Sequence, residues 1–164
     1  MRFNLLDRIT ELKPNESIAA VKALTLAEEY LADHFPLFPV MPGVLMLEAM
    51  YEASAWLVRA SEDFAHSIVV LKEARAVSYK EFVTPGQLLN VTAQIVKQDE
   101  QTTKLKTRGT VDGRDAVGGR LTLERYNLAD RVPSRTASDA VVISELRKIF
   151  DLLYCPSSSM EPAA

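Results

Sequence analysis

The sequence predicts an α+β fold in which an antiparallel sheet surrounds one long, buried central helix. Two observations support this fold class. The stretch from residue 42 to residue 60 is apolar on nearly its whole circumference, which is typical of a buried helix. Later runs alternate apolar and polar residues, the pattern of half-buried strands. With 164 residues, 48% of them hydrophobic, the chain is long enough to build one core of its own.

The strands are separated by recognisable turn and helix signals. Strands are expected at residues 8–13, 17–25, 66–71, 89–95, 104–111 and 120–124. Pro14-Asn15 marks a turn between the first two strands, and Asp112-Gly113 marks a later hairpin. A short helical turn is expected at 27–32. The central helix should begin at Pro42, because proline is favoured in the first turn of a helix.

The last part of the chain differs from the rest. Residues 136–139 resemble a capping box, and apolar residues recur after them at helical spacing. The sequence therefore predicts a domain of residues 1–128 and a C-terminal extension of residues 129–164, with an amphipathic helix at 136–154. This helix is expected to dock on the sheet or on a partner subunit. The small, polar final residues are expected to form a flexible tail.

Composition excludes several classes of function. A formal net charge of −3 argues against nucleic acid as the main partner, which would require a basic stripe. No run approaches the roughly 18–20 apolar residues of a membrane span, and the N-terminus lacks the apolar core of a signal peptide. The single cysteine, Cys155, rules out an internal disulfide and fits a reducing compartment. We therefore expect a cytoplasmic protein.

Groups suited to chemistry lie between residues 34 and 50, HFPLFPVMPGVLMLEAM. His34 lies in a proline-bracketed loop, and an imidazole that titrates near pH ~6.5 suits a general base. Glu48 is a lone acid on an apolar helix, where burial should raise its pKa and keep it protonated. The helix start at Gly43 offers free backbone N–H groups to a developing negative charge.

Each of these groups also has an ordinary structural role open to it. Taken alone, His34 is more often a simple loop histidine. Glu48 alone would fit an ion pair with an arginine such as Arg59 or Arg75. Pro42-Gly43 alone would fit a plain helix start.

The stretch resembles, residue for residue, the signature of FabZ-type 3-hydroxyacyl-acyl-carrier-protein dehydratases, which runs His-Phe-Pro, Met-Pro-Gly-Val-Leu and Glu-Ala. Residues 3–8 and 79–86 resemble further segments of that family, so the resemblance covers residues 3–127. It implies a hotdog fold, in which the sheet wraps around the helix. It also implies dehydration of (3R)-hydroxyacyl thioesters on acyl carrier protein to trans-2-enoyl thioesters, in fatty-acid or related acyl-chain biosynthesis.

The resemblance also implies roles for single residues. His34 would be the base and Glu48 the acid, while Gly43 would be the oxyanion donor. The backbone at Leu37, together with Pro42 and Val44, would shape the substrate site. In this family His and Glu meet across a dimer interface, so a homodimer or a trimer of dimers is expected.

Elimination of water is redox-neutral, so no cofactor is expected. No Cys/His cluster or glycine-rich phosphate motif suggests a metal or a nucleotide.

Acyl carrier proteins are acidic, so docking should use local basic residues. Candidates are Lys80, Lys104, Lys106 and Arg108. An equally good explanation for the row from Lys104 to Arg108 is a solvated strand face that discourages edge pairing.

Three residues depart from the family pattern. Leu37 replaces a glycine, Glu52 replaces a glutamine and Phe82 replaces a proline. Two other functions therefore stay open. One is a hotdog acyl-thioesterase in which the helix carboxylate activates water, which leaves His34 without a role. The other is a non-catalytic acyl-binding or scaffold protein that recruits a partner through its C-terminal helix.

Overall fold

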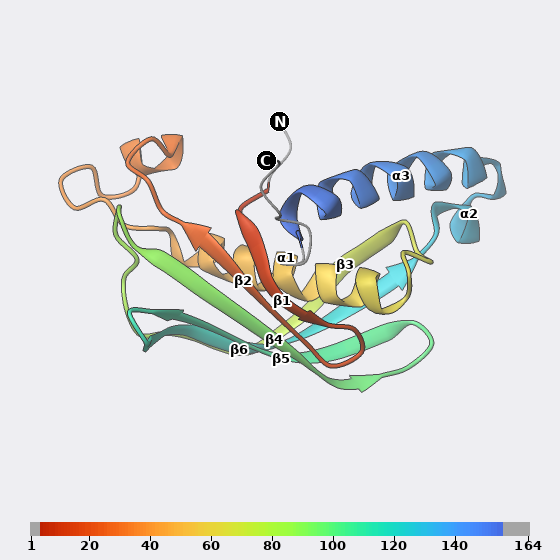
Figure 1. Cartoon of the computed structure of the whole chain (residues 1–164), viewed down its shortest axis with the longest axis horizontal. Helices are drawn as coiled ribbons and strands as arrows, with labels where there is room; N and C mark the ends of the chain where they lie inside the picture. Colours follow the sequence, from red (N-terminus) through yellow and green to blue (C-terminus); the bar gives the residue numbers. More distant parts are fainter. Residues whose placement is uncertain (1–3, 156–164) are drawn as a thin grey trace, which may run out of the picture.

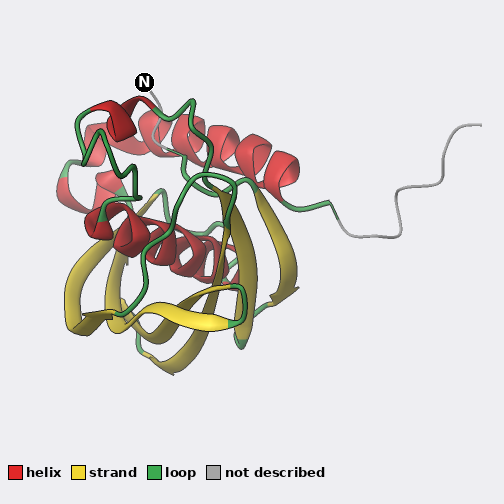
Figure 2. Ribbon diagram, turned by 90° about the vertical axis from the view of Figure 1, so that its left-hand side faces the viewer, coloured by secondary structure: helices red, strands yellow, loops and turns green. Residues whose placement is uncertain are grey.

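The computed structural model describes residues 4–155, which form one six-stranded antiparallel sheet with two long helices on one side of it (Figures 1 and 2). The elements in chain order are β1 (Arg8–Lys13), β2 (Ser17–Ala23), the 3₁₀ helix η1 (Glu29–Ala32), α1 (Gly43–Ser61), β3 (Ile68–Tyr79), β4 (Leu88–Gln98), β5 (Thr102–Val111), β6 (Arg114–Tyr126), α2 (Leu128–Arg131), the 3₁₀ helix η2 (Pro133–Arg135) and α3 (Thr136–Leu153). The expected α+β hotdog fold is confirmed.

The sheet has the strand order β1-β2-β4-β5-β6-β3, so β3 lies at an edge. Burial alternates along β4 and β5, whose inward side chains pack under α1. The hairpin between β5 and β6 turns at Asp112 and Gly113, whose φ angles are 50° and 78°. Positive φ at both central residues is the geometry that favours Asp-Gly, so the predicted hairpin turn is confirmed.

The prediction for the strand at 66–71 was too short, since β3 continues to Tyr79. Its second half is exposed on both faces except at Val77, so it lacks the alternation that reveals a half-buried strand. Two bulges interrupt its pairing with β6, and Ala76 takes a left-handed φ of 51° at the second one. β6 is likewise longer than the predicted 120–124.

The central helix is buried through its middle and its second half, but not all round as the sequence predicted. Residues from Ala49 to Val58 are buried except Tyr51, which is half-buried. In the first turn Val44 is 69% exposed. Figure 1 explains the difference, because α1 lies across the concave face of the sheet and its first turn extends toward one end of it.

The C-terminal helix forms a third layer, on the side of α1 away from the sheet (Figures 1 and 2). Phe150 holds it there through ring contacts with Trp56 at 6.0 Å and Phe64 at 5.4 Å between centroids. Asp139 is buried and accepts hydrogen bonds from the Ser67 hydroxyl and from two backbone N–H groups of α2.

The helix expected at 136–154 is therefore present. The segment between β6 and this helix contains α2 and η2. The division of the chain after residue 128 stays a prediction, and the predicted flexible tail lies outside the described residues.

Candidate active site

The loop that carries His34 is held in place by backbone hydrogen bonds. The N–H of His34 donates to the carbonyl of Tyr30 at 3.2 Å, and the N–H of Met41 donates to the carbonyl of Val83 at 2.9 Å. Phe35 follows with a φ of 52°, a left-handed conformation that a phenylalanine rarely adopts. Such conformations cost about 1–3 kcal/mol and cluster at functional sites.

The orientation of the His34 ring is set by a backbone carbonyl. Its Nδ1 lies 3.0 Å from the carbonyl oxygen of Val40, which can only accept a hydrogen bond. The proton of a neutral ring is therefore assigned to Nδ1, and Nε2 keeps a lone pair. This is the tautomer that a general base needs.

His34 and Gly43 line the same pocket, which has a volume of about 500 Å³. Other walls of the pocket come from Met41, Met46, Tyr79 and Phe82. Gly43 begins α1, and its N–H has no acceptor in the described part of the chain. A free N–H at a helix start carries partial positive charge, so this pocket pairs a base with a donor for negative charge.

The other residues predicted to shape the substrate site are less involved. Pro42 caps α1 from outside the helix, and Val44 points mostly into solvent. The Leu37 side chain is fully exposed and is absent from the lining of the His34 pocket. The leucine that stands at position 37 in place of the family's glycine therefore changes the surface of the loop and not the wall of the pocket.

Glu48 lies in a different pocket of the same chain. Five residues after Gly43 on a helix, its side chain projects about 140° around the axis from the Gly43 face. It lines a groove of about 230 Å³ together with Asn4, Tyr51, Glu52, Ala55, Trp56, Arg59 and Leu146. Burial raises the pKa of Glu48, as expected for a general acid. One chain thus brings His34 and Gly43 together but leaves Glu48 apart.

The structure argues against an ion pair as the role of Glu48. Arg75 pairs with Glu73 at 2.8 Å, and Arg59 forms no ion pair within residues 4–155. Glu48 itself has no hydrogen-bond or ion-pair partner among these residues. A half-buried carboxyl group with no partner in the described part of the chain fits a functional role better than a structural one.

Two residues near the site have no role predicted from the sequence, although one of them, Glu52, departs there from the family pattern. Glu52 is buried, and its carboxylate accepts hydrogen bonds from the N–H groups of Leu5 and Leu6 at 3.0–3.2 Å. Burial raises the pKa of Glu52 to about 7, although these hydrogen bonds oppose the shift. The Tyr79 ring covers Gly43. In the sequence, only the position of Tyr79 in the family-like segment 79–86 indicated that it could lie near the site.

A family model described as a FabA-like domain matches residues 1–120. The chain belongs to the FabA-like family. It is 35% identical over 119 residues to the 3-hydroxyacyl-[acyl-carrier-protein] dehydratase FabZ of Ruminiclostridium cellulolyticum, a match covering 73% of this chain and 84% of that protein. It is 37% identical over 120 residues to the protein of the same name from Lactococcus lactis subsp. cremoris, covering 73% and 83%. The predicted FabZ-type resemblance is confirmed.

Solved structures share the fold at low sequence identity. The dehydratase heterocomplex ApeI:P from Xenorhabdus doucetiae aligns with a TM-score of 0.64 and 20% identity, covering 81% of this chain and 90% of that chain. A hypothetical thioesterase with coenzyme A from Streptococcus pneumoniae aligns with a TM-score of 0.56 and 14% identity, covering 72% and 86%. At such identities these matches describe the hotdog fold alone.

Among residues 4–155, no helix is long and apolar enough to cross a membrane. The expected cytoplasmic location stays a prediction.

Proposed function

We propose that this FabA-like protein dehydrates (3R)-hydroxyacyl thioesters carried by acyl carrier protein, giving trans-2-enoyl thioesters and water in fatty-acid or related biosynthesis. The observation that carries the proposal is the His34 pocket, where an imidazole with a free Nε2 and the N–H of Gly43 line one cavity. The names of the relatives at 35–41% identity support the same reaction.

The reaction divides among three groups. Nε2 of His34 takes a proton from carbon 2 of the substrate, and the electron pair forms the new double bond to carbon 3. The hydroxyl group leaves carbon 3 and takes a proton from the Glu48 carboxyl group, forming water. Meanwhile the N–H of Gly43 stabilises the charge that develops on the thioester carbonyl oxygen.

The separation of His34 from Glu48 in one chain supports a site built from two subunits. The exposed edge strand β3 offers the pairing surface, because an edge strand presents unpaired backbone groups to another chain. We propose a homodimer formed through β3, in which His34 of one chain faces Glu48 of the other. A trimer of such dimers is compatible with this arrangement.

Two inactive variants test this arrangement when they are expressed together. His34→Ala and Glu48→Gln are each expected to lower turnover by about 10²–10⁴ without unfolding the protein. Coexpression is expected to restore about a quarter of the wild-type rate, because half of the dimers are mixed and each mixed dimer holds one intact site of two. A site within one chain would show no recovery.

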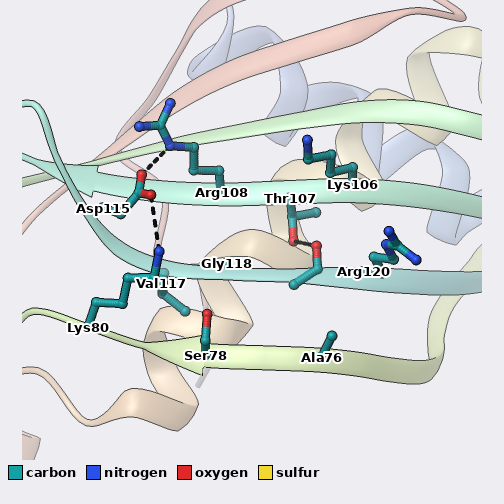
Figure 3. A pocket seen from close by; sticks show the side chains of 11 residues that line it. Ala76, Ser78, Lys80, Lys106, Thr107, Arg108, Asp115, Val117, Gly118 and Arg120 are labelled. Atoms are coloured by element: carbon teal, nitrogen blue, oxygen red, sulfur yellow. Dashed lines mark hydrogen bonds and ion pairs between the residues drawn. The ribbon is translucent and has the colours of Figure 1, made fainter.

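Basic residues beside the His34 pocket support a carrier protein as the partner. Lys80 lines both that pocket and a hollow of about 420 Å³ on the exposed face of β3, β5 and β6 (Figure 3). Of the predicted docking residues, Lys106 and Arg108 line the same hollow. Asp115 neutralises part of it by pairing with Arg108 and Lys80. We propose that an acidic carrier docks there.

Three cations align across the sheet beside this hollow, and two of them, Lys106 and Arg120, line it. Arg75 lies opposite Arg120, and Arg120 lies opposite Lys106. Like charges directly opposite each other are destabilising. Lys106 and Arg120 form no ion pair in the described part of the chain, so the row can receive an anionic partner.

The deciding assay follows enoyl absorbance with 3-hydroxyacyl carrier substrates of short, medium and long chains. Formation of the enoyl product that is lost in His34→Ala supports dehydration. Release of free thiol without an enoyl product would instead establish the thioesterase alternative. Binding without either product would establish a non-catalytic acyl-binding protein.

A further inference from the structure

The pocket of Glu48 is the start of a groove along α1. Its α1 residues are Glu48, Tyr51, Glu52, Ala55, Trp56 and Arg59, which follow one stripe of the helix. Arg59 is 11 residues beyond Glu48, so the groove extends about 16 Å along the helix axis at 1.5 Å per residue. Asn4 and Leu146 of α3 form its other walls.

Arg59 is half-buried, and its guanidinium has fewer hydrogen-bond acceptors among the described residues than it has donors. A guanidinium has five N–H donors. Its Nη2 lies 3.4 Å from the carbonyl oxygen of Val69, longer than an ordinary hydrogen bond, and that oxygen already accepts a 2.8 Å bond from the Tyr51 hydroxyl. Its Nε is buried and has no hydrogen-bond partner among residues 4–155.

No carboxylate neutralises Arg59 within the described residues. The carboxylate of Glu52 faces it, but its oxygens accept bonds from the backbone of Leu5 and Leu6. The guanidinium also interacts with the Tyr51 side chain and with the Trp56 ring, whose centroid lies 5.3 Å away, and neither group carries a negative charge to neutralise it. Arg59 is half-buried, and a charge partly removed from water without a carboxylate partner is costly.

The lining of the groove bears on the kind of acyl chain it accepts. A plain hydrocarbon chain would displace water from Arg59, Tyr51 and Glu52 without replacing any hydrogen bond, which is unfavourable. A chain with acceptor oxygens at its far end would supply the bonds that the guanidinium lacks. A carboxylate suits it best, because it accepts two parallel N–H bonds from one guanidinium.

We propose that Arg59 binds the far end of the acyl chain and selects substrates whose chain ends in a carboxylate. This inference rests on the proposed dehydratase function, which places the thioester beside Glu48 at the near end of the groove. Arg59 is therefore a specificity residue remote from the reacting carbons.

Calorimetry with paired acyl-pantetheine thioesters tests the inference without requiring turnover. The two members of each pair have equal length and end in a methyl or a carboxylate group, and a series of lengths is compared. The wild type is expected to bind the carboxylate form at least about tenfold more tightly at the length that reaches Arg59. Arg59→Met should remove that preference while methyl-ended binding stays within about twofold.

Matched variants separate recognition from charge and from folding. Arg8→Met removes an exposed arginine from β1 and should keep the preference. Arg59→Lys keeps the positive charge but cannot donate two parallel N–H bonds to one carboxylate, so we expect an intermediate preference for the carboxylate-ended ligand. It also serves as the test variant if Arg59→Met does not fold.

Three results would overturn the inference. The first is equal binding of both ligands by the wild type at every length. The second is an unchanged preference in folded Arg59→Met. The third is a change in the mass of the assembly on substitution, which would assign Arg59 to the subunit contact. Failure of the dehydratase proposal would show separately, as the absence of enoyl product from any substrate.

Discussion

The ring of Tyr79 lies against Gly43 so closely that a Cβ atom on Gly43 would come within 3.1 Å of its Cε1. The last residue of β3 thus covers the first residue of α1. A larger residue at position 43 would push the ring aside, and the ring forms an aromatic wall beside the proposed oxyanion donor.

Substituting Gly43 with alanine should therefore move Tyr79 and misplace the thioester. We expect a loss of about 10–100-fold in kcat/KM, since small displacements of a bound substrate are costly. The free energy of unfolding should change little, because the ring tip is partly exposed and can shift. The double variant Gly43→Ala with Tyr79→Ala should recover part of the activity. Full activity in Gly43→Ala would contradict this reading.

Glu52→Gln tests the buried carboxylate that holds the N-terminal segment. The folded-state pKa of Glu52, about 7, is above the ordinary value of 4.5. The folded protein then binds more protons than the unfolded chain between these values, so wild-type stability should fall as pH rises from about 4.5 to 7. Glutamine keeps an acceptor for Leu5 and Leu6 and cannot ionise.

Above pH 7, Glu52→Gln should therefore be more stable than the wild type by an amount on the order of 2–3 kcal/mol. Urea unfolding of both proteins across this pH range measures the difference. Parallel stability profiles for the two proteins would show that Glu52 does not titrate in this range.

Asp139→Ala tests how α3 is fastened to the body of the protein. The substitution leaves the N–H groups of Leu128 and Ala129 and the Ser67 hydroxyl without their common acceptor. We expect a melting temperature lower by several degrees and faster proteolysis around α2. Asp151→Ala, at an exposed position of the same helix, is the control and should behave like the wild type.

Phe150→Ala removes the aromatic residue between α3 and α1. Its ring contacts Trp56, Phe64 and Tyr154, so the loss should destabilise the protein by about 1–3 kcal/mol, less than for a fully buried phenylalanine. Leu152→Ala, where the side chain is 84% exposed, should cost much less. Equal effects of both substitutions in urea unfolding would contradict the packing described here.

Much of the fold could be predicted because its signals are local. The Asp112-Gly113 pair specifies its turn, and the alternation in β4 and β5 reflects one buried face. The second half of β3 has no such signal, because its residues are exposed on both faces of an edge strand.

The site could be predicted only in part. The loop of His34 and the helix start at Gly43 lie close in the chain, so their meeting in one pocket follows from local geometry. The partners of Glu52 lie 46 and 47 residues away and are backbone groups, which no side-chain pattern reveals. The isolation of Arg59 likewise depends on which carboxylates the tertiary structure brings near it.

The alignment of Arg75, Arg120 and Lys106 across three strands has a consequence for the response to ionic strength. Added salt screens repulsion between exposed charges over about 10 Å at 0.1 M. The free protein should therefore gain stability as salt is added, whereas its complex with an acidic carrier should dissociate. The same three side chains would thus make unfolding and carrier binding respond to salt in opposite directions.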